Sequence, residues 1–152
     1  MSQKERFCNE DVAGSVEYEI SMFRYLRREF DEKVGTGASP EFDALLESFL
    51  LHVRVLMDFF YGERSGDKAD DVIAADFVAG WNASPSEYLV KLRRPLNKLL
   101  AHLTLERQKY TADKFLWDTH GIAEELEPTI ERFLASLPDE TKPWFESRID
   151  FD

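Results

Sequence analysis

The chain has 152 residues, of which 43% are hydrophobic and 13% aromatic, which is enough apolar material for one domain with a single core. This composition excludes an intrinsically disordered chain, and the single Cys8 excludes an internal disulfide. The formal net charge of −11 disfavours non-specific binding of nucleic acid by the surface as a whole.

Neither a leader nor a membrane segment is expected. The first residues, MSQKERFCNEDV, contain no apolar stretch and so do not predict a signal peptide. The most apolar run, LLESFLLHVRVLMDFFY, is interrupted by charged residues and is too short to span a bilayer. We therefore expect a cytoplasmic protein without membrane contacts.

Helical spacing of apolar residues predicts two helices in the first half of the chain. The second begins after the break VGTGASP, where Ser39 suits the N-cap and Pro40 the first helical position. GERSGDKAD is a predicted loop, and DDVIAADFV is a predicted short helix that ends at Gly80. The expected inward positions are Val12, Val16, Ile20, Phe23, Leu26 and Phe30 in the first helix, and Phe42, Leu45, Phe49, Val53, Leu56 and Phe60 in the second.

The second half adds a further helix that contains a proline, and a long final helix. Ser84, as N-cap, and Glu87 form the pattern of a capping box, and Pro95 should then kink the helix or end it. The final helix should cover roughly residues 111–137. No segment alternates with the period of a strand. We therefore predict an all-α fold, a single-domain antiparallel bundle of four to five main helices with a short extra helix.

Within the single domain of residues 1–152, residues 1–10 are expected to form an N-terminal extension and residues 138–152 an acidic tail. Positive charge is concentrated elsewhere. Residues 91–109 hold six cations and one acid, which makes this basic strip +5 in an acidic protein. We expect the strip to bind an acidic protein partner or RNA, through Arg93, Arg94, Lys98 and Arg107. Alternatively, an acidic helix of the same molecule neutralises it.

Two polar residues of the strip are candidates for catalysis. His102 lies on the border between the predicted core and solvent, on the same stripe of the helix as Arg94 and Lys98. It is either a boundary histidine or the acid or base of a phosphodiester-cleaving site, with Asn97 as its companion.

The second predicted helix carries a polar set that we interpret as a structural network, in which Arg54 and Asp58 are four residues apart and should pair. The members of this network are Glu47, His52, Arg54 and Asp58. No HxxxH or ExxH pair and no glycine-rich phosphate loop is present, so we expect neither a metal nor a cofactor.

The stretch LNKLLAH, with Asn97 and His102, resembles the motif of the HEPN superfamily. Members are small helical bundles, often homodimeric, found in bacterial toxin–antitoxin and defence systems. Many are ribonucleases with an arginine, usually followed by a polar residue, and a histidine four to six residues further on. Here Leu96 stands where that arginine is expected. The resemblance implies a ribonuclease with His102 catalytic, whereas the concentration of positive charge in the strip favours a non-enzymatic binding module. The pairing of LLHVRVLMDFFY with LNKLLAHLTLER also resembles uncharacterised bacterial all-helical proteins.

Overall fold

The computed structural model describes residues 6–33, 39–64, 66, 69–100 and 117–146, and these residues form helices and loops without a strand. The predicted all-α fold is confirmed. The α-helices are α2 (Glu10–Lys33), α3 (Pro40–Tyr61), α4 (Glu87–Pro95) and α5 (Thr119–Ser136). Short helical segments are the 3-10 turns η2 (Ala74–Asp76) and η5 (Lys142–Phe145) and the π-helical segment η3 (Leu96–Leu100).

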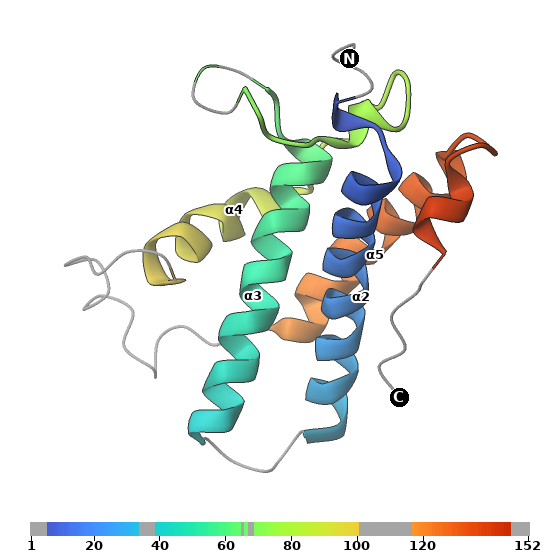
Figure 1. Cartoon of the computed structure of the whole chain (residues 1–152). Coiled ribbons are helices and arrows are strands. Elements are labelled where there is room, and N and C mark those ends of the chain that lie inside the picture. The colour runs from blue at the N-terminus through green and yellow to red at the C-terminus, as the bar shows by residue number, and fades with distance from the viewer. Residues whose placement is uncertain (1–5, 34–38, 65, 67–68, 101–116, 147–152) are drawn as a thin grey trace.

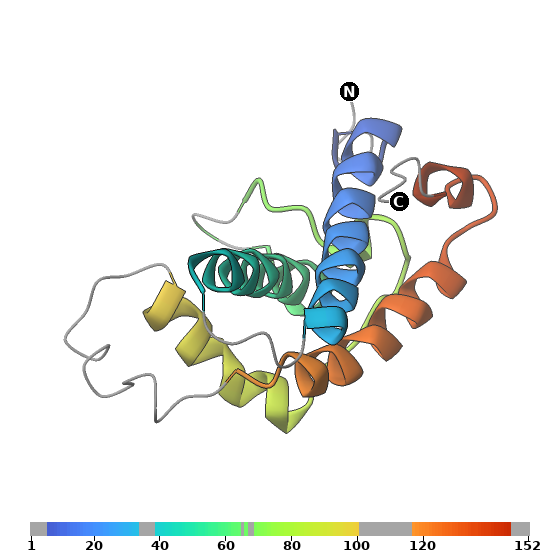
Figure 2. The same ribbon diagram turned by 90° about the horizontal axis from the view of Figure 1, so that it is seen from below.

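Two long helices form the centre of the molecule, and two shorter ones cover it. α2 and α3 run antiparallel beside each other (Figure 1), which follows from the short connection between them. α4 and α5 lie on the same side of this pair and cross it (Figure 2). The 3-10 turn η5 returns the chain to α2. No helix in the described ranges is both long and apolar enough to cross a membrane.

The core is built from the apolar faces that the helical spacing predicts. Val16, Ile20 and Phe23 of α2 are buried, and so are Phe49, Val53 and Leu56 of α3, while Phe42 and Leu45 are half-buried near the start of α3. Both ends of the chain add to this core. Phe7 is buried within the expected N-terminal extension, and Phe145 is buried within the expected tail.

One of the two predicted caps is confirmed and the other is wrong. Ser39 caps α3, because its side chain accepts a hydrogen bond from the Phe42 amide, and Pro40 begins the helix. The cap of α4 is Ser86 instead of Ser84, since the Ser86 hydroxyl accepts from the Leu89 amide at 3.2 Å. Glu87 is therefore the first residue of α4, and the predicted capping box does not form.

Other boundaries also differ from the prediction. The segment DDVIAADFV contains only the single turn η2, in which the Asp76 carboxylate accepts from the Ile73 amide at 2.9 Å. α5 begins at Thr119, where Asp118 caps it by accepting from the Gly121 amide. Trp117 and Asp118 are thus outside the final helix, and residues 111–116 lie outside the described ranges.

The chain stays helical beyond Pro95, but it is no longer a regular α-helix there. α4 reaches Pro95, and the chain continues directly into the π-helical turn η3. Because proline has no amide hydrogen and its ring clashes with the previous turn, a widened turn after it keeps the chain helical. The widened turn therefore shifts the residues of η3 from the positions that they would have on a regular α-helix.

Candidate functional site

The polar residues that the sequence singled out meet where α3 packs against the end of α4. Asp58 of α3 forms an ion pair with Arg93 of α4, in which the guanidinium Nη2 donates to Oδ1. The Asp58 side chain is 34% exposed and that of Arg93 is 44% exposed, so water screens the pair on one side. Asp58 thus pairs across the helix interface, and the expected pair of Arg54 with Asp58 along α3 stays a prediction.

This α3–α4 junction surrounds a small pocket. Its lining residues are Arg54, Met57, Asp58, Arg93, Leu96 and Asn97. The junction thus brings together Arg54 and Asp58 of the expected network. It also includes the expected binding residue Arg93 and the expected catalytic residue Asn97. The close approach of Asn97 follows from η3, since Asn97 is its second residue.

The basic strip is partly neutralised. Lys91 pairs with Glu87 at 2.7 Å, and both side chains are largely exposed. Arg93 is held by Asp58, while Arg94 is exposed and Lys98 is half-buried. Near the start of α4, burial raises the pKa of Tyr88, and the charges of Asp118 and Glu125 raise it further. Acidic residues therefore flank α4 on the side of α5.

The strip extends beyond the described residues. His102 and Arg107 fall in the segment 101–116, and so does Lys109. The part of the strip with a described structure is residues 91–98, which hold four cations and no acid.

His52 and Glu47 do not belong to the junction. His52 is buried and its Nδ1 lies 2.6 Å from Oε2 of Glu19 on α2. The ring of Tyr18 meets the His52 ring edge-on, with centroids 5.9 Å apart. Glu47 is exposed and lies five residues before His52 on α3. The expected network is therefore divided between two interfaces of α3.

His120, the third histidine, is exposed and pairs with Glu124 at 3.2 Å on its own helix. Among the residues with a described structure, no three His, Cys, Asp or Glu side chains are grouped so that they could hold a metal ion.

Sequence reasoning missed the contact of Asp58 with Arg93, which joins residues 35 apart in the chain. It also missed a larger cavity that Asp58 borders, between α2 and α3. Neither feature has a local signal, because each depends on how separate helices pack.

Comparisons with protein-family models, with curated proteins and with solved structures found no significant match for this chain.

Proposed function

We propose that the protein is a non-enzymatic binding module that holds single-stranded RNA through the basic surface of α4 and η3. The observation that carries this proposal is the concentration of four cations, without an acid, in residues 91–98 of a protein with a net charge of −11. Arg54 and Asn97 add a guanidinium and an amide at the junction beside them. Guanidinium and ammonium groups supply most phosphate contacts in RNA-binding proteins, and an amide can donate to a phosphate or a base.

The acidity of the remaining surface limits how such binding can occur. The ion pairs of Lys91 and Arg93 reduce the positive potential of α4. Arg94, whose side chain is exposed, and Lys98 are the cations that we choose for a test of phosphate contacts. Binding should then involve few contacts, be weak at physiological salt and depend on ionic strength.

The test is a titration of a labelled mixed-sequence single-stranded RNA, followed by fluorescence anisotropy at several salt concentrations. The double variant Arg94→Ala, Lys98→Ala should bind more weakly. Its plot of log affinity against log salt should be flatter, by about 0.7 units of slope for each lost phosphate contact. Lys142→Ala is the matched control, because it removes a cation from η5, which lies at the far end of the molecule from α4 (Figures 1 and 2). Equal affinity of the wild type and the double variant would contradict RNA binding at this surface and direct attention to an acidic protein partner.

A second candidate function is a HEPN-like ribonuclease in which His102 is catalytic. The observation that favours it is the convergence of polar groups from two helices, since Asn97 shares a pocket with Arg54, Asp58 and Arg93. In such a site an arginine would bind the phosphate, and a histidine could take the proton of the attacking hydroxyl or protonate the leaving oxygen.

His102→Ala distinguishes the two functions when melting temperature and RNA cleavage are both measured. For a binding module, neither the wild type nor the variant cleaves RNA. Cleavage by the wild type that disappears in an equally stable variant would establish the ribonuclease.

A further inference from the structure

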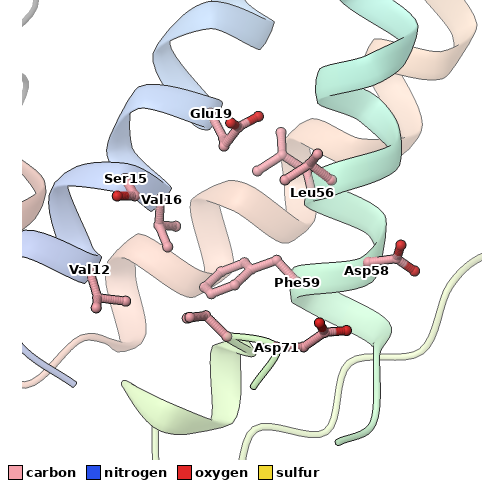
Figure 3. Close-up of a pocket in the computed structure, with 10 residues that line it drawn as sticks. Val12, Ser15, Val16, Glu19, Leu56, Asp58, Phe59 and Asp71 are labelled. Carbon is pink, nitrogen blue, oxygen red and sulfur yellow. The ribbon is translucent and has the colours of Figure 1, made fainter. Parts of the chain in front are cut away.

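A cavity lies between α2 and α3, with Asp71 towards one end of it (Figure 3). Val72 also lines it. We call it the α2–α3 pocket. Its volume is about 420 Å³, which lies within the range of small-ligand sites of roughly 300–1,000 Å³. None of the described residues of the basic strip lines it.

The middle of the pocket is apolar. Val16, Leu56 and Phe59 are buried side chains at its inner wall, and the Phe59 ring lies between α2 and α3. Val55, which is 39% exposed, stands at the rim. An aliphatic chain that packs against these side chains would bury apolar surface, which is favourable. The aromatic face of Phe59 also attracts a nearby cation.

The polar groups that line the pocket can accept hydrogen bonds, and most of them are carboxylates that attract a cation. They comprise the Ser15 hydroxyl and the carboxylates of Glu19, Asp58 and Asp71. Glu19 and Asp71 lie towards opposite ends of the pocket, with the Phe59 ring between them (Figure 3). Asp58 is compensated by Arg93, and Glu19 contacts His52. An ionised carboxylate has several lone pairs, so a carboxylate that already has one partner can accept a further N–H donor.

We propose that the α2–α3 pocket binds an aliphatic diamine, with one ammonium group at Glu19, the methylene chain against Phe59 and the second ammonium group at Asp71. This arrangement matches charge at both ends and apolar surface in the middle. A monoamine satisfies only one end, and a neutral alcohol satisfies neither. The three residues that define this site, Glu19, Phe59 and Asp71, lie outside the α3–α4 junction, and Asp58 lines both pockets.

The ligand series 1,5-diaminopentane, 1-aminopentane and 1-pentanol tests the proposal by NMR titration of the whole chain at constant ionic strength. Affinity should fall in that order, by about five- to tenfold at each loss of an ammonium group. Shifts should be confined to signals of α2, α3 and residues 71–72. Equal affinity for the diamine and the monoamine, or shifts spread over all acidic surfaces, would overturn the diamine site.

Two variants with matched controls locate the binding. Asp71→Asn should lower diamine affinity to that of the monoamine, whereas Asp70→Asn, an exposed neighbour outside the lining, should leave it unchanged. Val55→Trp should abolish binding by filling the pocket while every carboxylate is kept. Leu51→Trp, one turn earlier on α3 and 52% exposed, is its control. Undiminished binding by a folded Val55→Trp would overturn the proposal even if Asp71→Asn failed to fold.

Discussion

Two carboxylates, Glu19 and Asp58, each contact a side chain on another helix, and the two contacts differ in how deeply they are buried. Burial determines how much each contact contributes to stability. Glu19 meets His52 at a site where the His52 side chain is 9% exposed, whereas Asp58 and Arg93 each keep about a third or more of their surface in water. A hydrogen bond inside the core is costly to remove because the remaining partner stays buried without one. A screened pair at the surface is worth little, because water replaces the lost partner.

We therefore predict different losses of stability for two chemically similar substitutions. Glu19→Ala should lower the free energy of unfolding by about 1–3 kcal/mol, since it leaves the Nδ1 of buried His52 without its acceptor. Asp58→Ala should lower it by less than about 1 kcal/mol. Urea unfolding measures both losses, and Glu47→Ala, at an exposed carboxylate on α3, controls for a general change of charge. Equal losses for the two variants would refute the distinction by burial.

The same residues mark a limit of sequence-based prediction. Arg54 and Asp58 are one turn apart, so spacing alone favours their pairing. Arg93 reaches Asp58 because η3, which continues α4, packs against α3, and no local pattern predicts that packing. The burial of His52 near the core boundary was predictable from its apolar neighbours, whereas its partner Glu19 on another helix was not.

At the scale of single helices, local chemistry predicts some boundaries and leaves others ambiguous. Ser39 is followed at once by Pro40, and that combination selects one start for α3. Before α4 the chain reads SPSE, in which both serines can serve as a cap. Pro85 favours Ser84, but Ser86 is the residue whose extended backbone and hydroxyl meet the first turn. The direction from which the chain enters α4 decides between them, and that direction is a tertiary property.

The assignment of this cap gives a prediction with an internal control. Ser86→Ala should lower the free energy of unfolding by about 1 kcal/mol, because the Leu89 amide loses its acceptor. Ser84→Ala, two residues away and exposed, should change it by less than about 0.5 kcal/mol. Thermal unfolding followed by circular dichroism compares the two variants directly. A larger loss for Ser84→Ala would restore the capping box that the sequence favours.

At the scale of the whole molecule, one aromatic side chain connects the elements. Phe133 of α5 is fully buried and packs edge-on against Phe59 and Phe60 of α3, with centroids 5.2 and 5.5 Å apart. It also meets Trp81, which follows η2, and Phe145 of η5, at 5.7 and 5.4 Å. The sequence gives no local sign that three separate segments converge on Phe133. That convergence contributes to joining the C-terminal part of the described chain to the α2–α3 pair, beside the contacts of α5 and η5 with α2.

Removal of the Phe133 ring should therefore lower the stability of the whole molecule. Phe133→Ala should lower the free energy of unfolding by about 3–5 kcal/mol, because it leaves a large cavity among aromatic neighbours. Phe133→Leu keeps most of the volume and should cost clearly less. In every folded variant, tryptophan fluorescence and far-ultraviolet circular dichroism should give coincident urea transitions, since Trp81 packs on Phe133 and reports the same core as the helices. A fluorescence transition that precedes the loss of helix would show instead that the segments around Phe133 unfold separately from α2 and α3.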